Sequence, residues 1–223
     1  MRVMKAWILA APVACALAVG APAMAADETR TVPAFSAVDF SGFGKMEITA
    51  GETQSVTLIG SAKTLGRVMT DVHDDTLVVK WDQHKERHGW LWRFVMPDEE
   101  DKDKLTVKIS VPKLHKIGVS GASSVVAKGI DSEVMTVTLS GASKIRADGR
   151  ADKLALSISG AGEANLDRLV VKDASVSISG VGHAYVYPKD NLTADISGVG
   201  AVRYKGEPHV TSTISGAGSV KGK

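Results

Sequence analysis

Four carboxylates in the second half of the chain, Asp148, Glu163, Asp167 and Asp195, could act on a sugar. Glycoside hydrolysis needs two carboxyl groups that flank the scissile bond, roughly 5–9.5 Å apart. Glu163 and Asp167 are four residues apart and could meet that distance, as could many surface pairs. An enzyme of this kind would need its acids on one strand face of adjacent repeats, which the repeats of this chain do not show. The sequence therefore predicts no catalytic residues, and a polysaccharide-acting β-helix enzyme is the alternative.

The segment from Trp81 to Lys104 holds residue types that bind metals, namely Asp82, His84, Glu86 and His88. On a helix, the two histidines would share one face, and on a strand all four side chains would do so. We interpret this segment as a solvated excursion between two strands. The sequence therefore predicts no metal site and no cofactor.

The same segment contains the large apolar side chains Trp90, Trp92 and Phe94. These residues have two interpretations. They plug the end or side of the fold, or they form an exposed anchor for a partner, since tryptophan is favoured at interaction hot spots. Trp90, Trp92 and Phe94 are therefore the candidate partner-binding residues.

One short pattern recurs six times and organises the second half of the chain. It reads aliphatic-Ser-Gly-(Ala or Val)-(Ser or Gly), and consecutive copies are 18 to 20 residues apart. Its serines are Ser120, Ser140, Ser159, Ser179, Ser197 and Ser215. A near-constant step of this size is typical of a solenoid or array.

Aligning the copies on the serine shows which secondary structure each copy forms. The positions one, three and five residues before the serine are mostly aliphatic, and the positions between them are mostly polar. The alternation resumes five and seven residues after the serine. This period of two predicts a half-buried strand on each side of a Ser-Gly corner. At the corner we expect glycines with positive φ, or too close to the next copy for a Cβ atom, and serine hydroxyls bonded along their column.

These features predict an all-β fold, a single-chain parallel β-helix or solenoid with rungs of 18–20 residues. A β-sandwich is the alternative, because short strands with regular turns also describe it. We expect residues 26–114 to form irregular N-terminal rungs and a cap, with Ser41-Gly42-Phe43-Gly44 as an early, divergent corner. Residues 115–223 carry the regular repeats.

Residues 1–25 have the order of a secretory signal peptide. Arg2 and Lys5 precede an apolar run from Ala6 to Val19, and Ala23-Met24-Ala25 follows. We predict cleavage after Ala25 and a periplasmic, extracellular or cell-surface location for the domain of residues 26–223. No later segment is long and apolar enough to predict a membrane-spanning helix.

Charge and cysteine content narrow the expected partners and chemistry. The formal net charge of +2 comes from Arg2 and Lys5, so the rest of the chain is formally neutral. A neutral chain gives no electrostatic reason to expect nucleic acid as a partner. The one cysteine, Cys15, lies in the leader, so we expect neither disulfides nor thiol chemistry in the remainder.

The chain resembles the head GIN domain family, whose members are described as bacterial auto-transporter-type adhesins. The resemblance rests on the repeated SGAG and SGVG corners, on Val111-Pro112-Lys113-Leu114 before the first of them, and on Tyr204-Lys205-Gly206-Glu207-Pro208 near the end. It covers the chain from about residue 34 onward. The resemblance implies a β-solenoid and an adhesin-like role, and it supplies no catalytic or ligand-binding residues.

Together these observations predict an exported, non-catalytic module that binds an envelope protein or glycan. An architectural protein whose rungs stack end to end as a homo-oligomer is a further alternative, because an unpaired final rung would invite pairing with another chain.

Overall fold

The computed structural model describes residues 26–82 and 105–223, in which nearly all residues lie in strands. The expected all-β class is confirmed. Residues 1–25, expected to be a signal peptide, and the candidate residues His84, His88, Trp90, Trp92 and Phe94 lie outside the described residues. The elements, in chain order, are β1 (Ala26–Thr29), β2 (Ala37–Ala50), β3 (Ser55–Gly60), α1 (Ala62–Leu65), β4 (Val68–His73), β5 (Thr76–Trp81), β6 (Thr106–Val111), β7 (Lys116–Ile158), β8 (Ala161–Ile178), β9 (Val181–Ile196), β10 (Val199–Tyr204), β11 (His209–Ile214) and β12 (Ala217–Gly222).

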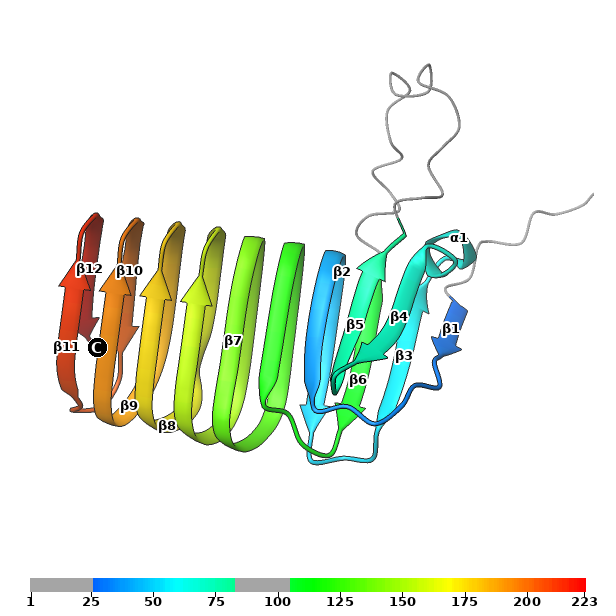
Figure 1. The fold of residues 1–223 in the computed structure, drawn as a ribbon, viewed down its shortest axis with the longest axis horizontal. Helices are drawn as coiled ribbons and strands as arrows, with labels where there is room; N and C mark the ends of the chain where they lie inside the picture. Colours follow the sequence, from blue (N-terminus) through cyan, green and yellow to red (C-terminus); the bar gives the residue numbers. More distant parts are fainter. Residues whose placement is uncertain (1–25, 83–104) are drawn as a thin grey trace, which may run out of the picture.

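β2 and the strands from β7 to β12 form flattened coils that lie side by side along the long axis of the molecule (Figure 1). Each coil has a strand before the Ser-Gly corner and a strand after it, and neighbouring coils pair in parallel. Ile158 pairs with Ile178, Ile178 with Ile196, and Ile196 with Ile214. The predicted alignment of the copies on their serines is therefore confirmed for these coils.

The divergent corner at Ser41-Gly42 occupies the expected place. In β2, Ser41 pairs with Ser120 and Gly42 with Gly121, in parallel with the first regular copy in β7. The Ser41 and Ser120 hydroxyls are 2.6 Å apart, so they form a hydrogen bond of the expected kind. Ser159 differs, because its hydroxyl donates to the Leu139 carbonyl oxygen at 3.4 Å. The corner serines thus form a hydroxyl–hydroxyl hydrogen bond at one place in the stack and a hydroxyl–backbone hydrogen bond at another.

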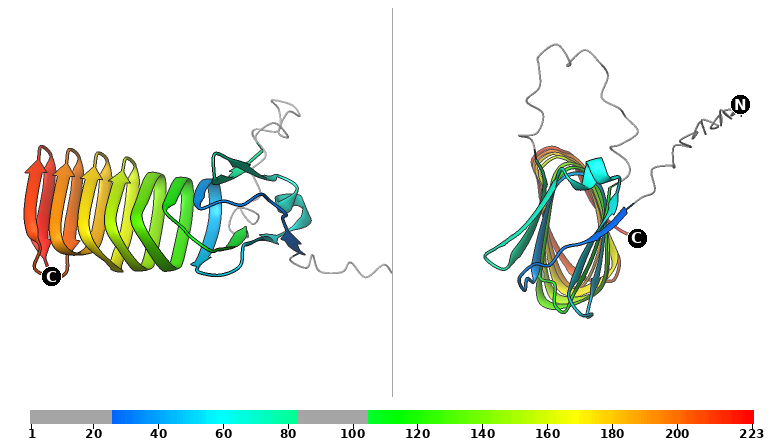
Figure 2. Two further views of the ribbon diagram at one scale, coloured as in Figure 1. Left: turned by 60° about the horizontal axis from the view of Figure 1, so that its bottom comes forward. Right: turned by 90° about the vertical axis from the view of Figure 1, so that its right-hand side faces the viewer.

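The first coils carry additional strands at the N-terminal end (Figure 2). β2 pairs in parallel with β5 and β6 as well as with β7. β3 then pairs antiparallel with β6, β1 with β3, and β4 with β5. Trp81, at the end of β5, packs edge-on against Phe43 and donates from Nε1 to the Phe43 carbonyl oxygen at 3.3 Å. The tryptophan side chain therefore covers the corner at Gly42.

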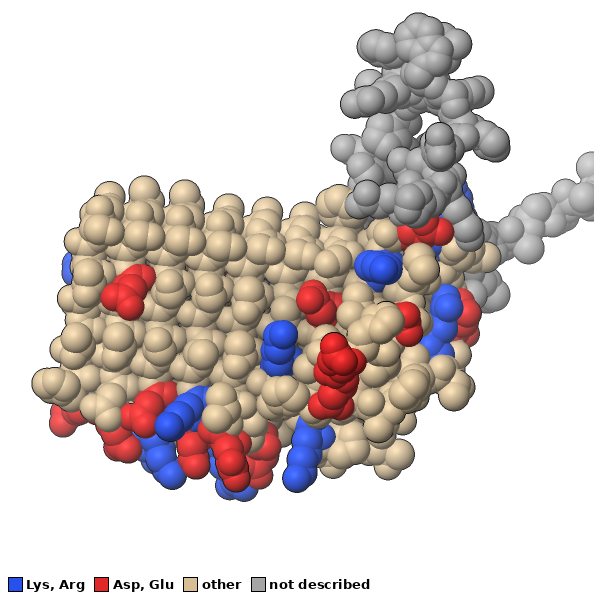
Figure 3. All heavy atoms as spheres, in the orientation of Figure 1, with Lys and Arg blue, Asp and Glu red and all other residues tan. Residues whose placement is uncertain are grey.

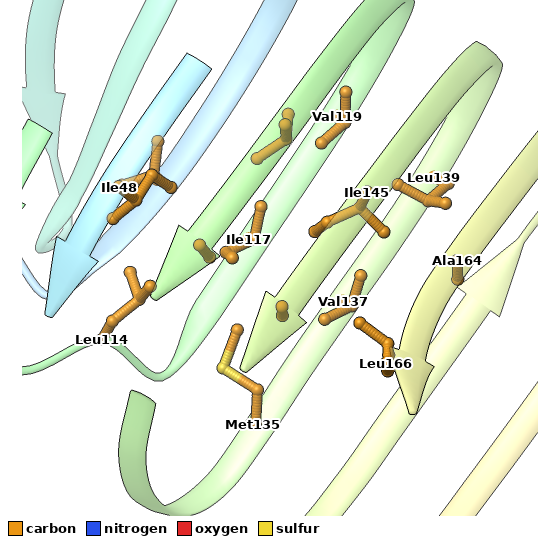
Figure 4. Close-up of a cluster of buried hydrophobic side chains, with 14 of the residues drawn as sticks. Ile48, Leu114, Ile117, Val119, Met135, Val137, Leu139, Ile145, Ala164 and Leu166 are labelled. Atoms are coloured by element: carbon orange, nitrogen blue, oxygen red, sulfur yellow. The ribbon is translucent and has the colours of Figure 1, made fainter. Parts of the chain in front are cut away.

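Aliphatic side chains from both strands of each coil fill the interior (Figure 4). Val119, Leu139 and Ile158, each one residue before a corner serine, are 2%, 0% and 0% exposed. From the strands that follow the corners, Ile145 lies beside Leu139 and Leu166 lies beside Val137. Because buried apolar surface contributes roughly 25 cal/mol per Å², the stacked interior supplies the main stabilising term.

Steric contact explains the glycine column more generally than backbone conformation does. Positive φ occurs at Gly121 and Gly141, at +103° and +96°. The expectation of positive φ is wrong for the glycines of the last four copies, Gly160, Gly180, Gly198 and Gly216. A Cβ atom at Gly180 would lie 2.2 Å from the Gly160 carbonyl oxygen, and the other column members meet a neighbouring glycine as closely. The backbones of successive corners are therefore too close together for any side chain.

Three residues after the serine, an inward-facing row changes from serine to glycine along the stack. Ser123 and Ser143 are buried, and the equivalent residues in the following copies are Gly162, Gly182 and Gly200. A Cβ atom at Gly182 would lie 3.0 Å from the Ile158 Cγ2 methyl. The isoleucine methyl thus takes the space that a serine side chain occupies in the earlier coils.

We predict that Gly180→Ala destabilises the fold, because the added Cβ collides with the backbone of the neighbouring corner. Overpacking typically costs roughly 1–3 kcal/mol and backbone strain adds to it. Chemical denaturation measures the change. The matched control is Gly66→Ala, where the nearest atom to an added Cβ is 3.4 Å away. Equal stability of the two variants would contradict the steric account.

Candidate functional site

The face formed by the strands before the corners carries two rows of short hydroxyl side chains. Figure 3 shows that this face is almost free of charge over β9 and β11 and that charged residues gather along the lower edge. Register pairs Ser175 with Thr193 and Thr193 with Thr211 in one row. Asp195 interrupts the other row between Ser177 and Thr213. This surface, the hydroxyl face, offers hydrogen bonds but little electrostatic attraction.

The charged edge is made of ion pairs between neighbouring coils. Arg150 makes a two-pronged contact with Asp131, from Nε at 3.0 Å and from Nη2 at 2.7 Å. Lys172 contacts Asp152 at 2.8 Å. The hydrogen bond from Arg150 lowers the pKa of the Asp131 carboxyl below its ordinary value. Opposite charges neutralise one another along this edge, so it presents no field of a single sign.

A groove of about 730 Å³ lies beside this edge. Ser36 and His115 line the groove, and the Ser36 hydroxyl lies 2.8 Å from His115 Nδ1. The same hydroxyl donates to the Asp75 carboxylate. In a serine nucleophile site the histidine stands between serine and acid, whereas here the serine stands in the middle. The arrangement therefore joins three segments and does not activate a nucleophile.

The strands after the corners carry a different surface, with a row of long polar side chains. Register pairs Arg146 with Asn165, Asn165 with Tyr185, Tyr185 with Arg203, and Arg203 with Lys221. We call these five residues the cationic row. The Arg203 guanidinium lies 5.9 Å from the centroid of the Tyr185 ring, within the range of a cation–π contact.

A second row runs beside the cationic row, two residues closer to the corners. It contains Lys144, Glu163 and His183 in consecutive coils, which pair in register. Lys144 Nζ contacts a Glu163 carboxylate oxygen at 2.9 Å. The hydrogen bond from Lys144, opposed in part by desolvation, holds the pKa of Glu163 below its ordinary value, and the charges of Lys144, Arg146 and His183 lower it further. This acid therefore lies in a positive field.

The four carboxylates considered for sugar chemistry do not converge. Glu163 is paired with Lys144, and Asp167 is paired with Lys205 at 2.8 Å. Asp148 accepts a hydrogen bond from the Gly129 backbone N–H at 3.0 Å. Asp195 belongs to the hydroxyl face, where Ser177 and Thr213 are its neighbours in register. The structure thus brings Glu163 and Asp167 into one strand but ties each of them to a lysine.

Among the residues that the structure describes, no three histidine, cysteine, aspartate or glutamate side chains form a group that could hold a metal ion. No helix within residues 26–82 or 105–223 is long and apolar enough to cross a membrane. The sequence analysis did not predict the cationic row, although aligning the copies on their serines places its five members in one column, six positions after each serine.

Comparison with known proteins identifies the fold and the family. No curated protein matches the chain. A structure named a putative adhesin from Bacteroides fragilis has 20% identity and a TM-score of 0.70, covering 89% of this chain and 97% of its own. A putative adhesin from Parabacteroides merdae has 21% identity and a TM-score of 0.46, covering 90% of this chain and 96% of its own.

The first of these structures shows a shared fold. The family model described as "Putative auto-transporter adhesin, head GIN domain" matches residues 34–208, which is most of the chain. The match confirms the resemblance that the Ser-Gly corners indicated, and this chain therefore belongs to the head GIN domain family.

Proposed function

We propose that this chain is an exported, non-catalytic β-solenoid module that binds a component of the cell envelope. Residues 1–25 are its cleavable signal peptide, and residues 26–223 form one domain with irregular N-terminal rungs. The domain acts in the periplasm or at the cell surface. The adhesin names of its family and of its structural neighbour support a binding role.

The observation that carries this proposal is the in-register pairing of successive coils. Parallel strands place equivalent outward side chains roughly 4.8 Å apart, and here the pairing continues through β8, β9, β10 and β12. Such a ladder presents one row of side chains along the long axis without large movements of the backbone. This geometry suits an extended ligand with repeating units, such as a glycan or an extended polypeptide.

Paired acids favour binding over catalysis. Glu163 and Asp167 each contact a lysine, and the hydrogen bond from Lys144 lowers the pKa of Glu163, so Glu163 is not poised to donate a proton to a leaving group. Trp90, Trp92 and Phe94 remain candidate partner-binding residues on the sequence argument.

We expect the exported protein to bind isolated cell-envelope material saturably, because its rigid rows offer many weak contacts to one extended ligand. Cosedimentation with peptidoglycan and with purified envelope polysaccharides measures this binding. Trp90→Ala tests the aromatic candidates, and loss of binding in that variant would assign the contact to the segment around Trp90. Failure of the wild-type protein to bind every envelope fraction would contradict the proposed function.

End-to-end association is a second candidate function, supported by the final coil. Ile214 is 41% exposed, whereas Ile196, its partner in register, is 1% exposed. β11 pairs with β9 and β12 with β10, so each uses one of its two edges. At the other end of the molecule, β1, β3 and α1 lie against the stack (Figure 1). We therefore expect β11 and β12 of one molecule to pair with β11 and β12 of a second copy.

If this edge pairs, the protein should form dimers that Ile214→Lys disrupts, because a charge on an apolar strand edge opposes association. Light scattering coupled to size-exclusion chromatography measures the mass. Thr138→Lys, an exposed residue of an interior coil, is the matched control and should leave the mass unchanged. A monomeric wild-type protein would rule out this second function and leave the envelope-binding function unaffected.

A further inference from the structure

We propose that the cationic row binds a linear, carboxylate-bearing polysaccharide that lies along the long axis of the stack. This inference rests on the proposed binding function and names the ligand class and the surface that takes it. The row consists of Arg146, Asn165, Tyr185, Arg203 and Lys221, which are consecutive partners in register.

The spacing of the row matches that of a polysaccharide chain. The four register steps from Arg146 to Lys221 extend over about 19 Å at roughly 4.8 Å for each step. One sugar residue of an extended polysaccharide has a length close to one such step. A chain of several sugars would therefore meet a new side chain of the row at about every residue.

The charge of this surface is unbalanced. Arg146, Arg203 and Lys221 are exposed, and the other two members, Asn165 and Tyr185, are uncharged, so the row has three positive charges and no acid. Within the described part of the chain, none of these three cations forms an ion pair with an acidic side chain. Elsewhere, cations of the charged edge are paired, as Arg150 is with Asp131. The row is thus an electrostatic surface left open to a ligand.

The neighbouring row leaves this field in place. Its acid, Glu163, is already paired with Lys144, and the hydrogen bond from Lys144 is the main reason why the pKa of Glu163 lies below its ordinary value, with the charges of Lys144, Arg146 and His183 lowering it further. Because Lys144 and Glu163 nearly cancel one another, the attraction for a ligand carboxylate comes from the cations of the row itself. Because arginine presents a planar fork of donors, Arg146 and Arg203 could each bind a carboxylate in two-pronged geometry.

A tyrosine stands at the centre of the row. Tyr185 is half-buried between Asn165 and Arg203, and the Arg203 guanidinium lies 5.9 Å from its ring centroid. That contact holds the guanidinium beside an aromatic surface before any ligand arrives. A ring of this kind offers apolar contact to a sugar face, while its hydroxyl and the Asn165 amide supply hydrogen bonds.

The same features favour a polysaccharide over nucleic acid. Proteins that bind single-stranded nucleic acid combine a basic groove with several aromatic side chains on which successive bases stack. This row offers one aromatic ring, and the chain outside the leader is formally neutral. Preferential binding of a nucleic acid would therefore contradict the proposal.

The test uses the full-length exported protein and polygalacturonate, a linear polymer with one carboxylate per sugar. Methyl-esterified polygalacturonate is the matched uncharged probe. Isothermal titration calorimetry should show at least about tenfold tighter binding of the carboxylate form, and the affinity should fall as salt rises from low to physiological concentration. Equal binding of both polymers, or no binding of either, would overturn the proposal.

Variants of exposed residues locate the binding surface. Arg146→Ala with Arg203→Ala should weaken polygalacturonate binding by about tenfold or more, and Tyr185→Ala should weaken it several-fold. Lys153→Ala, which removes an exposed positive charge outside the row, is the control and should change the affinity by less than about twofold. Thermal unfolding confirms that each variant is folded. If the control and the double variant lose affinity equally, binding depends on net charge alone, and the cationic row is not the binding site.

Two further comparisons separate this proposal from the broader function. A single-stranded oligonucleotide is the first comparison. If it binds as tightly as polygalacturonate, and if the same variants weaken its binding, the ligand of the row is a nucleic acid and not a polysaccharide. The double variant should also lose binding to isolated envelope material. If it keeps that binding, the proposed function stands and the cationic row is not its site. If the wild-type protein binds no envelope material at all, the proposed function itself fails.

Discussion

Parallel hydrogen-bonded pairing between successive coils is the interaction on which the rest of this structure depends. It fixes the distance between equivalent residues and brings the backbones of the Ser-Gly corners so close that a Cβ atom at Gly180 would lie 2.2 Å from the carbonyl oxygen of Gly160. It also aligns Ile158, Ile178 and Ile196 in one buried column. The constant glycine and the constant aliphatic residue are therefore two consequences of one ladder.

The same ladder assigns function to the outward-facing side chains. Inward positions must be aliphatic or very small, as the exchange of Ser143 for Gly162 beside Ile158 shows. Outward positions carry no such restriction, and the chain uses them differently on each side. One face has short hydroxyl side chains, the lower edge has paired charges, and the strands after the corners carry the cationic row around Tyr185. In the proposed binding function, recognition depends on such rows of side chains, with each coil contributing one residue to each row.

Much of the repeat region could be predicted from the sequence because its pattern is local and periodic. The alternation around Ser159 and Ser179 identified the strands, and the constant step placed Ile158 against Ile178. The conformation of Gly160 and Gly180 could not be predicted from residue type, since glycine accepts both signs of φ and the close approach alone selects it. The cationic row was missed because the alternation of aliphatic and polar positions marks Arg146, Tyr185 and Arg203 only as outward-facing residues and gives no reason to join them into one surface.

Contacts between distant segments were beyond sequence reasoning. Ser36 and His115 each stand five residues before a corner serine, but Asp75 belongs to no repeat, and it reaches them only because β5 pairs with β2 beside the start of β7. Trp81 is similar, since its position over the corner at Gly42 depends on the pairing of β5 with β2. Periodicity therefore predicted the stack, and only the folded chain shows how its first coils are joined.

Disulfide trapping tests the in-register stack most directly, because Cys15 in the leader is the chain's single cysteine. In a Cys15→Ser background, Ser157→Cys with Ser177→Cys joins two exposed partners in register on neighbouring coils. The account predicts rapid intramolecular oxidation of this pair, because Cα atoms roughly 4.8 Å apart suit a disulfide. Ser157→Cys with Asp195→Cys, two coils apart, should stay reduced. Oxidation of the second pair in preference to the first would contradict the stacked arrangement.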